Sequence, residues 1–309
     1  MRYFIGGTKL LCLLALAAIL PGAASAEDST NASLVAAYAP LGTLIFNQFA
    51  SAPFPHPDRA AGHTYHGTFY SAAEHYSDGT VAMFIPKNFR VTDQVDFVVH
   101  FHGWRHTVAG TLPEYKLIDQ FAASGRNAIL IVPQGPYNVP DSFGGKLEDT
   151  NGFSRFMAEA VDKLRASGAL GQTHFSIGKI ILSGHSGGYE VMSAIVDHGG
   201  LSDKIREVWL FDALYAGTER FVAWQKAQNG RLVDIYTDHG GTEGETGDLM
   251  ASYRTNGVSF FFSEDNNAVP ANLATNKLVF LHTDMIHNDV VSKRGNFQLF
   301  LETSCLAAP

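Results

Sequence analysis

The segment from Lys179 to Gly188 constrains the fold of this chain more than any other. It reads Lys-Ile-Ile-Leu-Ser-Gly-His-Ser-Gly-Gly, and a helix-like stretch follows it. The apolar start predicts a strand buried on both faces, and the glycines around Ser186 allow a sharp turn from that strand into the helix. Such a turn presents the serine hydroxyl at its apex, near a helix N-terminus that favours negative charge. The alternative is an ordinary helix start that Ser186 merely caps.

Short apolar runs alternate with helix-like stretches from about Thr80 onward. The predicted strands are Val81–Ile85, Val95–Phe101, Ala128–Val132, Lys179–Leu182, Val208–Phe211, Leu232–Tyr236, Val258–Phe262 and Leu278–Leu281. The predicted helices are Pro113–Ser124, Gly152–Ser167, Gly187–Asp197, Glu219–Gln228, Gly247–Thr255 and Phe297–Thr303. This alternation predicts a doubly wound, mostly parallel α/β sheet with helices on both faces. Residues 27–309 are expected to form a single domain, with 27–79 as a lead-in that contains a helix over Ser33–Phe49.

The N-terminus has the layout of a secretory signal peptide. Arg2 and Lys9 supply positive charge, an apolar run of 11 residues extends from Leu10 to Leu20, and small residues at 24–26 offer a cleavage site. The apolar run is too short to span a membrane, which takes about 20 residues. Residues 1–26 are therefore predicted to be removed on export to the periplasm or the medium, leaving no stable membrane anchor. The alternative is a buried N-terminal helix.

Charge and cysteine content narrow the partners of the exported chain. Cleavage removes two of the 22 basic residues and none of the 30 acidic residues, so 20 positive and 30 negative groups leave a formal charge of −10. This charge argues against nucleic acid and against electrostatic binding to anionic membranes. Cleavage also removes Cys12, and because Cys305 is the remaining cysteine, no internal disulfide is expected. A soluble protein with a large apolar core is predicted.

A serine at such a turn needs a base to become a nucleophile, and histidine suits that role near neutral pH. Two histidines follow the last predicted strand. His282 still belongs to the apolar run, whereas His287 lies in the loop beyond it and is the preferred base. Two aspartates compete to orient this histidine. Strand order favours Asp238. The apolar surroundings of Asp212 favour Asp212 instead, because a buried carboxylate is costly without a partner. We expect Asp212, with Asp238 as the alternative.

Backbone N–H groups must stabilise the negative charge that develops in acyl transfer. One is expected from Gly187, directly after the serine. The second is expected from the loop after the strand at residues 94–101, where Gly103 allows close approach of the backbone. The N–H of Trp104 is the first candidate there and that of Gly103 the next.

Three histidines near this loop suggest a competing interpretation. His100 and His102 share one strand face and, with His106, have the spacing of a metal site. Since no carboxylate completes the cluster nearby, a structural role is preferred and no metal or other cofactor is expected.

Taken together, these motifs resemble the α/β-hydrolase superfamily over about three quarters of the chain. The matching residues are His102-Gly103, Gly184-x-Ser186-x-Gly188, a late aspartate and His287, in the order serine, acid, histidine. The resemblance implies the α/β-hydrolase fold and hydrolysis of an ester, amide or similar acyl bond through an acyl-enzyme. The extra strand-like run at 258–262 departs from the pattern and leaves the identity of the acid open.

The favoured function is that of an exported serine hydrolase acting on carboxylic esters. An exported peptidase or amidase with the same Ser-His-Asp arrangement is the first alternative, and a non-catalytic binding protein on a hydrolase fold is the second. The segment from Asp212 to Gly230 has only 19 residues, which leaves little room for a lid. An open site of this kind suits a small acyl ester or the end of a polymer, with contacts expected from the loop at residues 133–149.

Overall fold

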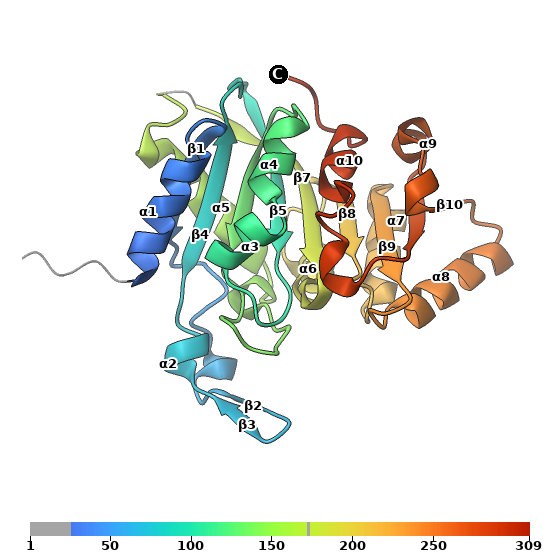
Figure 1. Ribbon diagram of the computed structural model, residues 1–309, viewed down its shortest axis with the longest axis horizontal. Coiled ribbons are helices and arrows are strands. Elements are labelled where there is room, and N and C mark those ends of the chain that lie inside the picture. Colours follow the sequence, from blue (N-terminus) through green and yellow to red (C-terminus); the bar gives the residue numbers. More distant parts are fainter. Residues whose placement is uncertain (1–25, 172–173) are drawn as a thin grey trace, which may run out of the picture.

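A nine-stranded sheet forms the centre of the protein (Figure 1). The computed structural model describes residues 26–171 and 174–309. In spatial order the strands are β1 (Gly42–Gln48), β4 (Thr80–Pro86), β6 (Ala128–Pro133), β5 (Gln94–Phe101), β7 (Ser176–His185), β8 (Ile205–Phe211), β9 (Arg231–Thr237), β11 (Leu278–Thr283) and β10 (Phe261–Glu264). Strand β4 pairs antiparallel with β1 and β6, and all other neighbouring strands are parallel. The predicted mostly parallel sheet is confirmed.

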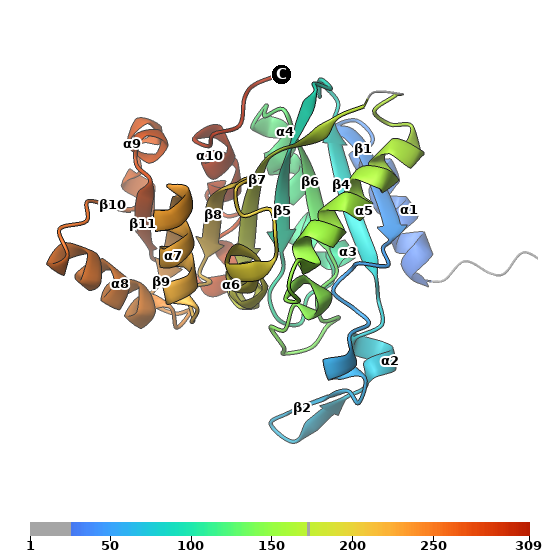
Figure 2. The same ribbon diagram turned by 180° about the vertical axis from the view of Figure 1, so that it is seen from behind.

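Helices cover both faces of the sheet, as predicted (Figures 1 and 2). One face carries α1 (Ala26–Tyr38), α3 (Val108–Glu114), α4 (Leu117–Ala123), α9 (Pro270–Thr275) and α10 (Asn296–Glu302). The other carries α5 (Gly152–Ser167), α6 (Tyr189–His198), α7 (Thr218–Gln228) and α8 (Glu243–Thr255). Apolar side chains from both faces of the strands pack against these layers, which explains why the strand sequences lack polar alternation.

The predicted signal peptide lies almost wholly outside the described residues, since the description begins at Ala26. Within the part of the chain that the structure describes, no helix combines the length and apolar character needed to cross a membrane.

Helix α5 has the bounds that its periodicity predicts. Its apolar stripe, which includes Phe153, Phe156 and Leu164, is buried against the sheet. The helix ends where Gly168 adopts a φ of +70°, a conformation that costs glycine little. Local sequence and tertiary packing therefore agree over this element.

The helix predicted over residues 247–255 begins four residues earlier, at Glu243, and two other predicted helices differ more from their predicted bounds. The helix expected over residues 33–49 ends at Tyr38, and β1 follows, because Pro40 and Gly42 interrupt it before an apolar, β-branched run. The helix expected over residues 113–124 is two helices, separated by Lys116 with a φ of +48°. The first of them begins earlier, where the Thr107 hydroxyl accepts a hydrogen bond from the backbone N–H of Gly110.

The run at residues 258–262 also differs from its prediction. Its strand, β10, begins at Phe261 and lies at the edge of the sheet beyond β11. Because β9 and β11 are direct neighbours, the extra strand does not separate the candidate acid loops from the histidine loop. Helix α9 lies between β10 and β11 in the sequence and was not predicted.

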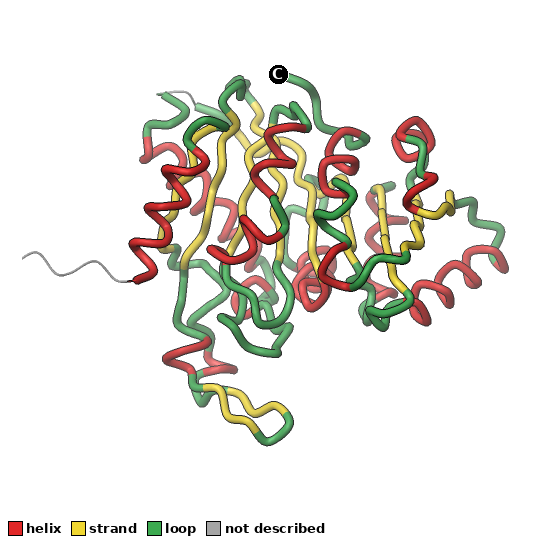
Figure 3. The backbone as a smooth tube through the Cα atoms, in the orientation of Figure 1, coloured by secondary structure: helices red, strands yellow, loops and turns green. Residues whose placement is uncertain are grey.

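A small projection at residues 57–75, hereafter the arm, interrupts the chain between β1 and β4. It contains the hairpin β2 (His63–Tyr65) and β3 (Thr68–Tyr70), followed by α2 (Ala72–His75). Figure 3 shows the hairpin extending away from the sheet. The arm contributes no strand to the large sheet, so residues 27–79 combine an edge strand with a separate surface element.

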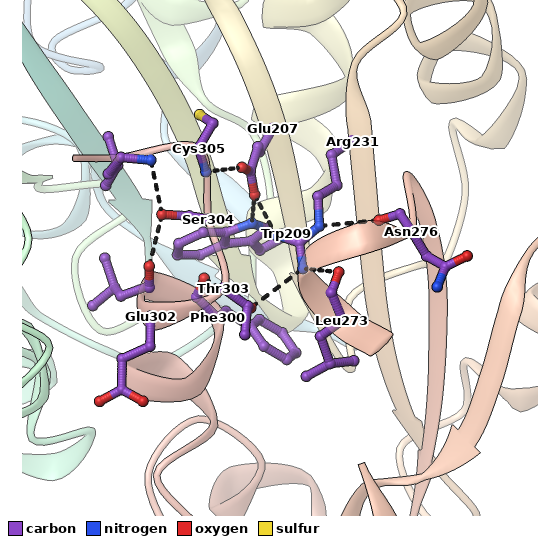
Figure 4. A network of polar contacts seen from close by, with 12 residues as sticks. Glu207, Trp209, Arg231, Leu273, Asn276, Phe300, Glu302, Thr303, Ser304 and Cys305 are labelled. Atoms are coloured by element: carbon purple, nitrogen blue, oxygen red, sulfur yellow. Dashed lines mark hydrogen bonds and ion pairs between the residues drawn. The ribbon is translucent and has the colours of Figure 1, made fainter. Parts of the chain in front are cut away.

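A buried polar network fixes the C-terminal segment at the amino ends of β8 and β9 (Figure 4). Glu207 forms a 2.5 Å ion pair with Arg231 and accepts a hydrogen bond from the indole of Trp209. Its second oxygen accepts the backbone N–H of Cys305 at 2.6 Å. Such additional hydrogen bonds offset the cost of removing a buried ion pair from water, and both oxygens of Glu207 have them here.

Candidate active site

The candidate residues converge at the carboxyl ends of the parallel strands. Ser186 follows β7, Asp212 follows β8, and His287 lies in the loop after β11, while Gly103 follows β5. Parallel strands bring these four loops to one edge of the sheet, which is where open α/β sheets bind their ligands.

Ser186 adopts a left-handed backbone conformation, with a φ of +53°. For a non-glycine residue this conformation is strained, and it is typical of a nucleophile at a tight strand-to-helix turn. The glycines of the motif permit the turn. A Cβ at Gly188 would lie 2.8 Å from the carbonyl oxygen of Phe101, whereas one at Gly184 would first meet the flexible end of the Met192 side chain. At Gly188 the backbone of Phe101 therefore leaves no room for a side chain, as predicted.

Asp212 lies directly beside His287. Its carboxylate is fully buried, and Oδ2 is 2.5 Å from His287 Nδ1. The hydroxyls of Thr237 and Thr242 also donate hydrogen bonds to this carboxylate. The contact with Asp212 fixes the hydrogen on Nδ1 of a neutral imidazole, which leaves Nε2 free to accept a proton.

Asp238 lies elsewhere and binds a different histidine. Its Oδ1 is 2.8 Å from His282 Nε2, while Glu264 contacts His282 Nδ1 at 2.7 Å. Partial burial alone would lower the pKa of His282, but the hydrogen bonds to the two carboxylates raise it. The structure thus brings Asp212, and not Asp238, to His287.

The loop after β5 packs closely against the nucleophile turn. A Cβ at Gly103 would lie 2.7 Å from Ser186 Cβ, so a larger residue at position 103 would displace the serine. A Cβ at Gly187 would lie 2.7 Å from Trp104 Cδ1. The three residues expected to form the oxyanion hole, Gly103, Trp104 and Gly187, therefore surround the serine.

His102, one of the three histidines of the possible metal cluster, joins two loops. Nε2 of His102 accepts the backbone N–H of Gly135, so Nδ1 carries the hydrogen and donates to the carbonyl oxygen of Gly103. Burial lowers the pKa of His102 to about 4 and that of His100 to about 3, so both are neutral at physiological pH. Among residues 26–171 and 174–309, no three metal-binding side chains are grouped to hold an ion.

Comparison with known proteins rests on structure, because no family model and no curated protein sequence matches this chain. It is similar to the feruloyl esterase module from Clostridium thermocellum complexed with sinapinate. The TM-score is 0.52 at 8% identity, covering 85% of this chain and 88% of that one. It is also similar to a ferulic acid esterase, with a TM-score of 0.54 at 14% identity, covering 85% and 98%. This chain has the α/β-hydrolase fold.

Within this hydrolase fold, His185 positions the histidine loop and was not predicted. Its pKa lies well below the usual value, chiefly because the ring is fully buried and also because His287 is close, so the ring is neutral. Nε2 donates to the backbone carbonyl of His287 at 2.9 Å, and Nδ1 accepts from the Tyr115 hydroxyl. His185 lies inside the Gly-x-Ser-x-Gly motif, and its position directly before the serine is the sequence feature that could have indicated its role.

Tyr215 is a second residue that was not predicted. Its ring lies 6.4 Å from that of His287, and its hydroxyl donates to the carbonyl oxygen of Gly240. Burial, and to a lesser extent the charge of Asp212, raises the pKa of Tyr215 to about 12. A hydrogen bond with the Ser186 side chain lowers this pKa but does not offset the two other effects. Tyr215 therefore stays protonated and links the loops that carry the serine, the acid and the histidine.

A pocket of about 200 Å³ opens beside the serine. Its lining residues are Trp104, Ser142, Ser186, Gly187, Tyr189 and Tyr215. Ser142 comes from the loop at residues 133–149, which was expected to reach the substrate, and its Oγ accepts the Trp104 indole N–H at 2.7 Å. The pocket gives a substrate carbonyl direct access to the nucleophile turn.

Proposed function

We propose that this protein is an exported hydrolase of carboxylic esters with Ser186 as nucleophile, His287 as base and Asp212 as the acid. The observation that carries the proposal is the buried Asp212–His287 contact of 2.5 Å beside a serine in strained backbone. The two solved structures described above are named as feruloyl or ferulic acid esterases, which favours an ester over a peptide substrate.

The proposed reaction assigns each residue one role. His287 Nε2 takes the proton of Ser186 Oγ as the oxygen attacks the substrate carbonyl carbon. Asp212 stabilises the resulting imidazolium, and the backbone N–H groups of Gly187 and Trp104 bind the oxyanion. His287 then gives its proton to the departing alcohol, which leaves an acyl-enzyme. Water, activated by the same histidine, releases the acid and restores the serine. No cofactor is required.

A fluorophosphonate probe tests this proposal, because it forms a stable adduct with an activated serine. We expect one adduct per chain, mapped by peptide mass spectrometry to the peptide that contains Ser186. We also expect hydrolysis of p-nitrophenyl acetate and no cleavage of peptide p-nitroanilides. An unlabelled protein, or an adduct on another serine, would contradict the proposal. Cleavage of the anilides with labelled Ser186 would instead identify a peptidase.

Export is the second part of the proposal and rests on the layout of residues 1–26. The secreted or periplasmic protein is expected to begin at Glu27, as measured by intact mass. A chain that retains Met1 and stays in the cytoplasm would contradict this part alone.

A further inference from the structure

Three aromatic side chains form much of the pocket beside Ser186. Trp104 follows β5 and Tyr215 follows β8, the two strands that flank β7 on opposite sides. Tyr189 begins α6 and packs on Tyr215, with ring centroids 5.8 Å apart. Trp104 and Tyr215 remain 39% and 37% exposed, so large apolar faces are open to a ligand at this mouth.

The arm holds Trp104 in place from outside. Tyr65, the last residue of β2, lies edge-on to the indole, with ring centroids 5.2 Å apart and the planes at 75°. On its other side the indole donates a hydrogen bond to Ser142 Oγ and contacts Gly187. Trp104 is therefore a fixed wall of the pocket, and a preorganised wall binds a ligand at lower entropic cost.

Size and charge restrict what the pocket accepts. A volume of about 200 Å³ exceeds the roughly 150 Å³ of a cavity that holds benzene, and is below the roughly 300–1,000 Å³ of pockets for drug-sized ligands. None of the six lining residues carries a charge, so nothing in the lining compensates an ionic group. Aromatic rings pair favourably at centroid distances of about 4.5–7 Å, a geometry that these walls offer.

We infer that the pocket binds a planar, uncharged aromatic ring of the ester substrate, and that Trp104, braced by Tyr65, determines this specificity. The inference rests on the proposed ester hydrolase function and names the class of its substrate. The ring belongs to either the acid or the alcohol of the ester, and matched substrates separate the two.

The test compares kcat/KM for two pairs of esters. Methyl cinnamate and methyl butyrate differ in the acyl group, whereas (2-naphthyl)methyl acetate and butyl acetate differ in the alcohol while keeping a primary alcohol of similar leaving-group strength. We expect wild type to prefer the aromatic member of one pair by about 10-fold or more. Trp104→Ala should reduce this preference about 10-fold, whereas Trp104→Phe, which keeps a ring, should retain most of it. Because Trp104 also belongs to the oxyanion loop, the ratio within a pair is the readout.

The arm supplies a matched pair of variants. Tyr65→Ala should reduce the aromatic preference several-fold by releasing Trp104. Phe69→Ala changes a residue that is 62% exposed on the same hairpin, and should leave the preference unchanged.

Tryptophan fluorescence gives a readout that does not depend on turnover. Trp209 and Trp224 are buried, so Trp104 is the tryptophan that a ligand at this pocket reaches. Methyl cinnamate, or (2-naphthyl)methyl acetate if the ring belongs to the alcohol, should quench the fluorescence of Ser186→Ala and much less that of Ser186→Ala/Trp104→Phe.

The outcomes separate the two proposals. If butyrate and acetate esters are hydrolysed and Ser186 is labelled, but no aromatic preference responds to Trp104→Ala, the ring inference is wrong and the hydrolase proposal stands. If no ester is hydrolysed and Ser186 is not labelled, both are wrong.

Discussion

Asp212→Asn is expected to lower kcat for p-nitrophenyl acetate by about 10⁴-fold, the loss known for removing the acid of a serine triad while keeping its shape. The amide nitrogen of asparagine can donate to His287 Nδ1, which favours the tautomer that carries its hydrogen on Nε2. That tautomer cannot accept the proton of Ser186. Steady-state kinetics, with circular dichroism to establish folding, measures the effect.

Asp238→Asn is the matched control, since it makes the same chemical change at the other candidate acid. Asp238 is half exposed and pairs with His282, away from His287. We expect kcat to change by less than about threefold, because the pair is not part of the proposed proton transfer. A 10⁴-fold loss in Asp238→Asn with an active Asp212→Asn would reverse the assignment.

Gly240→Ala is expected to reduce kcat/KM by about 10²- to 10³-fold without replacing any side chain of the proposed triad. A Cβ at this position would overlap the Asp212 carboxylate, and the carbonyl oxygen of Gly240 accepts the hydrogen bond of Tyr215. The carboxylate must therefore move away from His287, and small displacements of positioned groups carry costs of this order.

Gly244→Ala provides the control for that substitution. It lies in α8, where no atom stands within 4 Å of an added Cβ, and alanine favours a helix over glycine. Activity close to wild type is expected, with equal or higher thermal stability. Equal activity of Gly240→Ala and Gly244→Ala would show that the carboxylate does not depend on this glycine.

The sequence predicted the elements whose local signals and packing agree. Helix α5 combined an apolar stripe with a terminal glycine, and the central strands were continuous apolar runs. The predicted single helix over residues 113–124 was wrong because Lys116 adopts a left-handed backbone conformation, which a lysine in the sequence does not predict. Bounds of this kind depend on the tertiary structure around them.

In the candidate site, too, some features were predictable from local sequence and others depend on the tertiary structure. The glycines around Ser186 and the apolar surroundings of Asp212 were local signals, and the structure brings Asp212 to His287 as the latter signal suggested. The contact between Tyr65 and Trp104 joins residues from separate segments, and no sequence pattern connects them. Pocket walls made by such distant pairs become visible once the chain is folded.

The arm contacts a wall of the pocket but is not part of the large sheet or its core. It leaves the sheet after β1 and returns before β4, and Tyr65 touches the indole from a hairpin whose tip lies in solvent. Insertions, deletions or exchanges at that tip leave the pairing of the large sheet unchanged, because the arm contributes no strand to it. If Trp104 and Tyr65 set the ring specificity as we infer, the substrate range can diversify through the arm, by natural variation or by directed evolution, without a change at Ser186, Asp212 or His287.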